Sequence, residues 1–151
     1  MARATRRRTI AVPRAAVWEL VSDPYSLPRW WPRTTRVEDV EPGDPAEGRQ
    51  WTTVLQTTEG RGVRADFRCS EAVDGERYGW RQQVEGTPFE RHLRGSSVEI
   101  ALEDAGAGET ELALSSVQAL RGLSRLGSPL MRRGQAALLE EALDGVERAL
   151  L

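Results

Sequence analysis

The hydrophobic and polar positions at the start of the chain predict one strand followed by two short helices. Residues 3–12 alternate between two faces, as a strand requires. Pro13 suits the first turn of a helix, and residues 16–21 then place apolar side chains at helical spacing. Asp23 precedes a proline, a pair typical of the cap and first position of a helix, so we expect a second short helix through about Trp30.

From residue 35 onward the period changes to two, which predicts a sheet. Turns rich in glycine, proline and aspartate separate the alternating runs. The predicted strands begin near Val37 and continue as residues 50–57, 63–70, 78–84 and 98–102, with a last strand through Leu112 and Leu114. In residues 63–70 one side is apolar and the other is charged, so the sheet has a buried face and a solvated face. If the parity of this strand is shifted, Arg64, Asp66 and Arg68 are instead polar anchors in a pocket.

The segment before residue 98 is ambiguous. Gly95-Ser96-Ser97 is a candidate bulge, and a bulge shifts the parity of the side chains. The sequence therefore leaves undecided which side chains before it face into the sheet and which face outward. The undecided residues are Phe89, Arg91, His92 and Leu93.

The C-terminal stretch, from about Leu126 to Leu150, has the period of one long amphipathic helix. Glu140, Glu141 and Asp144 lie on its polar side. Binding to a membrane surface is an alternative for such a helix, but anionic lipid would repel its acidic face, so packing against the sheet is favoured. Gly134 near its start leaves space for a ligand or for a large neighbouring side chain.

This order of elements predicts an α+β fold in which the helices lie on one face of an antiparallel sheet. A curved antiparallel sheet of about six or seven strands is expected to wrap around the long C-terminal helix, with the two short helices after the first strand. Residues 1–151 are expected to form a single domain, because 151 residues suit one hydrophobic core. A long helix does not fill the concavity of a strongly curved sheet, so we expect a pocket between them.

Composition narrows the classes of function. The 21 basic residues, all arginine, against 23 acidic residues give a net charge of −2, which argues against a dedicated nucleic-acid binder. No apolar run is long enough to span a membrane, and the charged N-terminus is not followed by the apolar segment of a secretory signal. Cys69 is the only cysteine, which excludes an internal disulfide and argues against a thiolate metal cage. We expect a cytoplasmic monomer or homodimer with no metal and no cofactor.

The run Arg6–Arg8 has two interpretations. It is a candidate patch for a polyanion, but it lacks the interleaved aromatic residues on which nucleic-acid bases stack. A solvated edge strand, whose charges discourage pairing with another chain, is the favoured interpretation.

The aromatic residues point to a pocket. The chain has five Trp but only two Phe and two Tyr, and tryptophans commonly line concave surfaces. The residues that share the apolar faces of the strands and the helix are mostly apolar with a few hydrogen-bonding groups, the mixture typical of a small-molecule pocket. The candidate ligand-binding residues are Trp30, Trp51, Thr53, Leu55, Phe67, Cys69, Trp80, Gln82, Leu112, Leu114, Met131, Gly134 and Leu138. Thr53 and Gln82 would orient a carbonyl or hydroxyl group. The alternative is that all these side chains pack together without a cavity.

No complete catalytic constellation is legible. His92 is the only histidine, so it provides neither a Ser-His-Asp arrangement nor a metal site. Cys69 shares an apolar face with Phe67, which favours a small buried hydrophobe over a nucleophile. Trp30 is in the same way interpreted first as a core plug. The candidates for polarising a carbonyl group are His92, Arg91 and Gln82.

Several strings of residues resemble a known family. Ile10-Ala-Val-Pro-Arg-Ala-Ala-Val-Trp-Glu-Leu-Val-Ser-Asp23, followed by Leu27-Pro-Arg-Trp-Trp-Pro32, resembles the opening of the polyketide cyclase/dehydrase branch of the SRPBCC superfamily, which has the START-like, helix-grip fold. Gly86-Thr-Pro-Phe-Glu-Arg91 and Leu120-Arg-Gly-Leu-Ser-Arg-Leu-Gly127 resemble actinobacterial members. The resemblance runs from about Ile10 to Leu150. It implies a hydrophobic cavity between the sheet and the C-terminal helix, with an entrance near the short helices and loops.

The resemblance leaves more than one function open, because the family includes polyketide aromatase/cyclases as well as lipid and quinone carriers. The first hypothesis is binding of a hydrophobic small molecule, aromatic, polyketide-like or lipid-like. The alternative is a polyketide cyclase, aromatase or dehydratase that acts by positioning its substrate and polarising carbonyl groups. A third hypothesis, a protein-interaction module that uses the outer face of the sheet, predicts a filled interior and an exposed apolar patch.

Overall fold

The computed structural model describes residues 2–43, 45–57, 59–121 and 128–151. In chain order the elements are β1 (Ala2–Ile10), α1 (Arg14–Val21), the short 3-10 helix η1 (Pro24–Ser26), α2 (Leu27–Trp30), β2 (Thr34–Glu38), β3 (Gln50–Gln56), β4 (Gly62–Val73), β5 (Arg77–Gln82), the 3-10 helix η2 (Pro88–Arg91), β6 (Leu93–Gly106), β7 (Glu109–Leu120) and α3 (Ser128–Leu150). None of the described helices is long and apolar enough to cross a bilayer.

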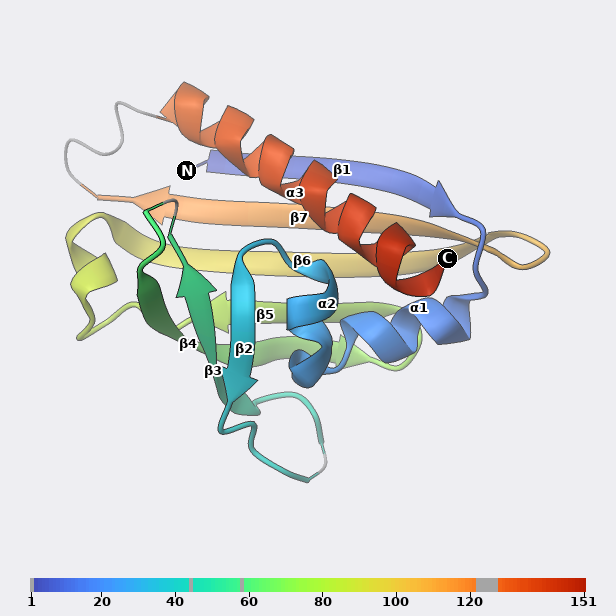
Figure 1. The fold of residues 1–151 in the computed structure, drawn as a ribbon, viewed down its shortest axis with the longest axis horizontal. Helices are drawn as coiled ribbons and strands as arrows, with labels where there is room; N and C mark the ends of the chain where they lie inside the picture. Colours follow the sequence, from blue (N-terminus) through green and yellow to red (C-terminus); the bar gives the residue numbers. More distant parts are fainter. Residues whose placement is uncertain (1, 44, 58, 122–127) are drawn as a thin grey trace.

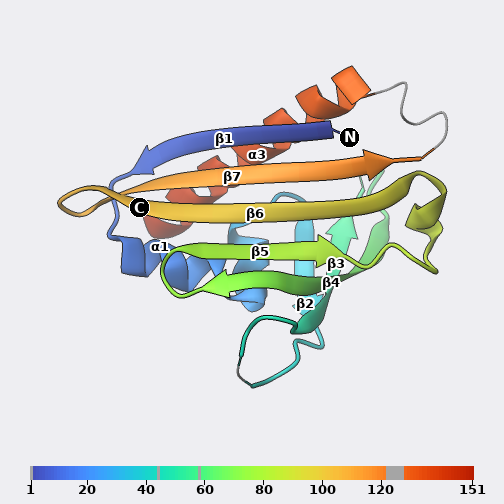
Figure 2. The same cartoon turned by 180° about the vertical axis from the view of Figure 1, so that it is seen from behind.

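The strands form one antiparallel sheet in the order β1-β7-β6-β5-β4-β3-β2. Figure 1 shows α1, α2 and the long α3 all on one face of this sheet, and Figure 2 shows the other face free of helices. The predicted helix-grip fold is therefore confirmed, with seven strands. We call the face toward the helices the inner face and the opposite one the outer face.

The local signals at the first two helices act as expected. Pro13 precedes α1, whose Val17, Leu20 and Val21 are buried. The side chain of Asp23 accepts a hydrogen bond from the backbone N–H of Tyr25 at 3.0 Å, with a proline at the first position of η1. This cap fixes the turn that leads from α1 into α2.

The two faces of the sheet have the predicted character. On β4, Ala65 and Cys69 are buried, whereas Asp66 and Arg68 are exposed. Asp66 accepts a hydrogen bond from the Thr52 hydroxyl at 2.6 Å on the outer face. The alternative parity, which would turn Arg64, Asp66 and Arg68 toward the inner face as polar anchors of a pocket there, is therefore wrong.

The register near the predicted bulge is irregular between Leu93 and Gly95. This shift places Leu93 opposite Leu120, whose side chain is buried on the inner face. Phe89 is half-buried, whereas Arg91 and His92 are exposed. The bulge thus separates an inward Leu93 from the solvated end of η2.

The interpretation of Arg6–Arg8 as a solvated strand needs a correction. The register places Arg6 opposite Leu114 and Arg8 opposite Leu112, so both arginines lie on the inner face. Arg8 donates hydrogen bonds to side chains of α3, and Arg6 lies 3.5 Å from one of them. The three acceptors of Arg8 are Asp144 at 2.6 Å, Glu140 at 2.7 Å and Glu147 at 2.9 Å. These arginines fasten α3 to β1, because the acidic flank of the helix lies directly over them.

The C-terminal helix packs against the sheet, as predicted. Its buried side includes Leu139, Leu143 and Val146, which belong to the same core cluster as Leu112 and Leu114. The predicted first residue, Leu126, and Gly127 lie outside the described residues. Packing on the sheet, rather than on a membrane, therefore accounts for the amphipathic pattern of α3.

Candidate functional site

Tryptophan rings fill the part of the inner face that lies next to α2. Trp30 packs edge-to-face against Trp31 and Trp80, with ring centroids 5.4 and 6.2 Å away. Trp51 and Tyr78 extend this cluster from Trp80, at 6.4 and 6.3 Å. Trp30 is only 1% exposed, which fits its interpretation as a core plug. This half of the inner face is a packed aromatic wall.

Polar side chains cross the other half of the inner face. Gln82 on β5 lies opposite Phe67, and Ser96 on β6 lies opposite Gln118 on β7. From α3 above them, Gln135 donates through Nε2 to the Ser116 hydroxyl at 3.2 Å. Gln82 and Gln118 on the sheet and Gln135 on α3 therefore place three amide groups on the inner side of the sheet.

Most of the buried polar atoms without a partner lie on this face. Among the eight such side-chain atoms of the described residues, those on the inner face or facing it include Trp30 Nε1, Trp51 Nε1, Thr53 Oγ1, Gln82 Nε2, Gln118 Oε1 and Gln135 Oε1. Buried polar groups in native proteins are nearly always hydrogen-bonded, and each one that is not costs about 1–3 kcal/mol. The inner face thus presents donors and acceptors that a molecule placed there would satisfy.

The inner face carries little charge. From β3 to β7, the inward side chains of the described residues are uncharged except for Asp104 on β6, which pairs with Arg14 of α1 at 3.2 Å. Just before β3, Arg49 lines a hollow together with Tyr78. Arg6 and Arg8 on β1 are the inward arginines, and the carboxylates of α3 neutralise them. A neutral molecule would be accommodated here at a lower desolvation cost than a charged one.

An apolar hollow of about 570 Å³ opens at the end of the sheet where β4 begins. It is lined by Gly62, Val63, Arg64, Pro88, Phe89, His92 and Leu93. Val63 lies opposite Leu55 and Leu93 opposite Leu120, so the hollow continues the inner face toward solvent. We call it the mouth.

The candidate ligand-binding residues divide into three groups. Leu112 and Leu114 are completely buried beneath α3. Four more candidates lie deep in the core cluster: Trp30, Trp51, Cys69 and Trp80. The half-buried or polar inward residues that approach the mouth or the amides are Thr53, Leu55, Phe67, Gln82, Met131 and Leu138. Gly134 is exposed, and an added Cβ there would meet nothing within 4 Å, so its role as a lining residue stays a prediction. The inward position belongs to the next residue, Gln135.

The sequence interpretation missed Ser116, Gln118 and Gln135. The alternation that starts with Leu112 and Leu114 continues at every second residue, so it identifies Ser116 and Gln118 as inward. Gln135 is four residues before the buried Leu139, so the helical period identifies it as inward too. These polar residues lie where the apolar pattern ends, which is why an apolar template passes over them.

The three candidates for carbonyl polarisation lie in different surroundings. Gln82 is on the inner face, with its buried Nε2 unpartnered. His92 lies on the rim of the mouth, and Arg91 is exposed at the end of η2. Gln82 is therefore the candidate that can donate to a molecule on the inner face.

The buried thiol and phenol are held in their neutral forms. Burial raises the pKa of the Cys69 thiol, which donates to the backbone oxygen of Glu71 at 3.4 Å. Burial likewise raises the pKa of Tyr78, and a hydrogen bond between the two side chains contributes. A thiol that stays protonated is a poor nucleophile, as expected for a core residue.

Comparison with known proteins agrees with this architecture. A family model described as polyketide cyclase / dehydrase and lipid transport matches residues 1–150. No curated protein matches the chain in sequence.

Similar solved structures cover nearly all of this chain. A START superfamily protein from Mycobacterium smegmatis superposes with a TM-score of 0.80 at 12% identity, over 99% of this chain and 97% of that one. The di-domain ARO/CYC BexL from the BE-7585A biosynthetic pathway gives 0.78 at 19% identity over 99% of this chain, which spans only 46% of BexL. The Zhui aromatase/cyclase from Streptomyces sp. R1128 gives 0.70 at 20% identity, over 98% and 90% of the two chains. The chain belongs to the polyketide cyclase/dehydrase and lipid transport family, and it has the START-like helix-grip fold.

Proposed function

We propose that this protein binds a neutral, hydrophobic small molecule with several oxygen atoms, of an aromatic or polyketide-like kind. The molecule lies against the inner face between the aromatic wall and the mouth, beneath α3. The observation that carries this proposal is the group of unpartnered buried amide, hydroxyl and indole atoms on an otherwise apolar surface.

The chemistry of these atoms favours an oxygenated ligand over a simple acyl chain. An acyl chain would leave the buried donors and acceptors of Thr53, Gln82 and Gln118 unsatisfied, whereas carbonyl and hydroxyl groups complete them. Trp51 and Phe67 are nearly parallel, at 18° with centroids 6.2 Å apart, and present flat apolar surfaces. Such surfaces suit rings. A lipid-like ligand would suit the apolar mouth but would leave the hydrogen-bonding groups of the glutamine amides unsatisfied.

The charge distribution favours a neutral ligand. A carboxylate placed over β1 would lose its hydration and find no free cation there, because Arg6 and Arg8 are neutralised by α3. Burial of an unpaired charge is strongly unfavourable. Fatty acids and other carboxylates are therefore expected to bind poorly.

A cyclase or dehydratase is the second candidate, and Gln82 is the observation that favours it. Its unpartnered Nε2–H can donate to a carbonyl oxygen, and a bound chain held in one fold would gain rate from positioning. Two of the similar structures are named as aromatase/cyclases, which supports this candidate at the level of the fold. A cyclase or dehydratase also needs a group that accepts a proton. Cys69 and Tyr78 remain protonated and do not supply one, so another residue would have to do so. Binding without chemistry is therefore the better-supported proposal.

The test measures the binding of flavone, an uncharged aromatic ketone, by quenching of tryptophan fluorescence. Gln82→Leu removes the unpartnered amide and is expected to weaken flavone binding about tenfold, since a lost hydrogen bond and a misfitted carbonyl together are worth about 1–2 kcal/mol. The same variant is expected to unfold at a higher temperature without ligand, because a buried unsatisfied group is replaced by an apolar one.

The matched control is Gln56→Leu, an exposed glutamine at the end of β3 that does not face inward. It should change flavone affinity less than twofold. Comparison of flavone with 3-methylflavone-8-carboxylate adds a charge to the same rings and should abolish binding. Unchanged affinity in Gln82→Leu, together with equal binding of the carboxylate, would overturn the proposed ligand class.

A further inference from the structure

An arginine pair on the outer face of the sheet lacks the ion pairs that its neighbours have. The register places Arg68 on β4 directly opposite Arg81 on β5, and both are exposed. Like charges directly opposite each other in an antiparallel sheet are destabilising. Neither guanidinium forms an ion pair with a carboxylate among the described residues.

Other arginines on the same two strands are neutralised. Arg64 on β4 lies 3.0 Å from a carboxylate oxygen of Glu38, and Arg77 on β5 lies 2.8 Å from one of Glu71. Asp66, two residues before Arg68, is engaged by the Thr52 hydroxyl. Arg68 and Arg81 therefore remain without a neutralising carboxylate among the described residues.

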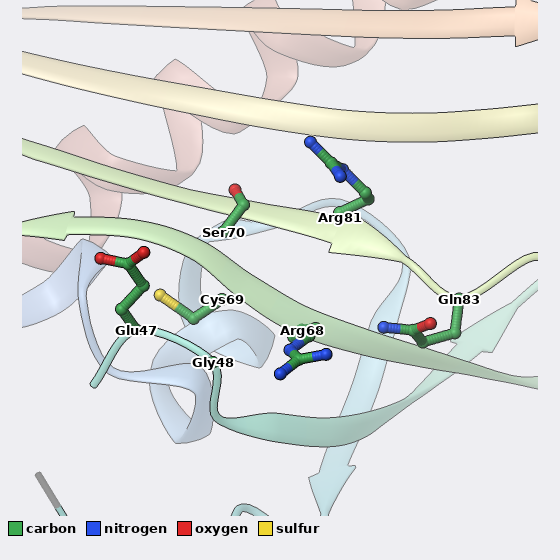
Figure 3. A pocket seen from close by; sticks show the side chains of 7 residues that line it. All are labelled: Glu47, Gly48, Arg68, Cys69, Ser70, Arg81 and Gln83. Carbon is green, nitrogen blue, oxygen red and sulfur yellow. The ribbon is translucent and has the colours of Figure 1, made fainter. Parts of the chain in front are cut away.

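The pair borders a hollow of about 450 Å³, which Figure 3 shows from close by. Its lining residues are Glu47, Gly48, Arg68, Cys69, Ser70, Arg81 and Gln83. In Figure 3 the side-chain amide of Gln83 points toward Arg68, while the one carboxylate of this lining, on Glu47, lies at the other end beside Cys69. Arg68, Arg81 and Gln83 therefore offer two guanidiniums and an amide N–H₂ to this hollow, and Ser70, next to Cys69, adds a hydroxyl.

We propose that this hollow binds a phosphoryl group. Guanidiniums donate in a planar fork that matches the oxygens of phosphate, and a dianion with three free oxygens accepts from both arginines at once. A monoanionic carboxylate has two oxygens and half the charge, so it relieves the repulsion less completely. The site lies on the opposite face of the sheet from the proposed ligand-binding face, so it is independent of the proposed function.

The phosphoryl group can be carried by a small phosphate monoester or by a phosphorylated protein segment, because the hollow opens on the exposed face of the sheet. Both sources present the same oxygens to Arg68 and Arg81. The exposed setting limits the affinity for the group alone, since water and salt screen exposed charges. The carrier of the group would add the remaining affinity.

The test titrates inorganic phosphate into the protein at constant ionic strength, and follows the Nε–Hε signals of the arginines by NMR. We expect saturable binding that Arg68→Gln and Arg81→Gln each weaken about tenfold, the loss of one charge-assisted contact. Arg77→Gln removes the same charge from the same face but from an arginine that is already paired, and should change the affinity less than twofold. Phenyl phosphate and a phosphoserine peptide should bind through the same arginines, and the tighter of the two identifies the source.

Stability gives a second readout that does not depend on tight binding. Phosphate should raise the unfolding temperature of the wild type above its value in chloride of equal ionic strength, and Arg81→Gln should lose that increment. Equal weakening in Arg77→Gln, absence of saturable phosphate binding to the wild type, or benzoate binding as tightly as phosphate would each overturn the assignment. Flavone binding to the inner face should be the same with and without phosphate.

Discussion

Gly145 of α3 lies directly against the backbone of Trp30 in α2. A Cβ added at Gly145 would stand 2.8 Å from Trp30 Cα and 2.9 Å from its carbonyl carbon, closer than real Cβ contacts allow. The absence of a side chain is therefore what lets the C-terminal helix rest on the short helix that carries the aromatic wall. This contact sets how closely the part of α3 around Gly145 approaches α2.

Gly145→Ala should destabilise the protein by about 1–3 kcal/mol, because the obstacle is backbone and cannot rotate away. Gly134→Ala on the same helix is the control, since an added Cβ there meets nothing within 4 Å. It should raise stability by about 0.5–1 kcal/mol, the usual gain on replacing glycine in a helix. Urea unfolding of the two variants measures both effects. Equal effects of the two substitutions would show that the contact with Trp30 does not constrain α3.

Arg8 is expected to hold α3 through charge rather than through shape. Its hydrogen bond to Asp144, with those to Glu147 and Glu140, raises the pKa of Arg8 above its ordinary value. A raised pKa means that this stability is present at every pH below the ordinary value of arginine and is lost only as pH rises beyond it. The contribution is therefore constant across the neutral range and should depend on salt instead.

Arg8→Met should lower the free energy of unfolding by about 1–2 kcal/mol at low salt, and by less in 1 M NaCl, where exposed carboxylates are screened. Arg7→Met is the control, because Arg7 is exposed and lies on the outer face. The free energy of unfolding of Arg7→Met should stay within about 0.5 kcal/mol of the wild-type value. Measurement of urea unfolding at two salt concentrations checks both. A loss in Arg8→Met that salt does not reduce would contradict the charge-based account.

Stability should fall at alkaline pH because of Cys69 and Tyr78. Burial raises both pKa values above the ordinary 9.0 and 10.0, so the unfolded chain releases these protons at a lower pH than the folded protein does. The resulting stability is complete below about pH 9 and is lost as pH rises through the folded values. Tyr78→Phe should flatten the decline in unfolding free energy above about pH 10, the ordinary pKa of tyrosine, whereas the decline that starts near pH 9 belongs to Cys69. The same slope in the variant and the wild type would exclude Tyr78 as its source.

Asp23 should contribute to stability and not to ligand binding. Asp23→Ala removes the acceptor for the Tyr25 N–H and should cost about 0.5–2 kcal/mol, the usual loss of a helix cap. Asp23→Asn keeps a capping oxygen and should recover most of that loss. Thermal melting and flavone titration of both variants separate the two roles. Weaker flavone binding with an unchanged melting temperature would assign Asp23 to the site.

The alternation and helical period of the sequence were sufficient for the fold. The strands around Trp51, Phe67 and Trp80 and the long C-terminal helix follow from local pattern, because one face of each must be buried. The family resemblance added the sheet-and-helix architecture, which the seven-stranded order confirms. Register was not accessible in the same way, and Arg8 shows the consequence. Its charge suggested solvent, but pairing with β7 turns it toward α3.

The candidate site was predicted less completely, for a physical reason. Apolar residues that face inward recur with the period of their strand, so the sequence predicts the inward positions of Leu55 and Phe67. The amides of Gln118 and Gln135 occupy inward positions that an apolar pattern rejects, and Gly134 was chosen in place of its neighbour. The mouth depends on the bulge before β6, and a bulge changes side-chain direction in a way that the sequence alone left open. An apolar template therefore misses Gln118 and Gln135, whereas it includes Thr53 and Gln82, which alternate with apolar residues on the same face.

The most direct test observes the side-chain amide of Gln82 while flavone binds. In a ¹H–¹⁵N spectrum, the Nε2–H signals of Gln82 should move downfield on saturation with flavone, as a donor does when it gains an acceptor, and those of Gln118 should shift as well. The exposed amide of Gln56 should stay where it is. Saturating flavone that leaves the Gln82 signals unchanged would contradict the claim that the inner face recognises an oxygenated guest through its unpartnered amides.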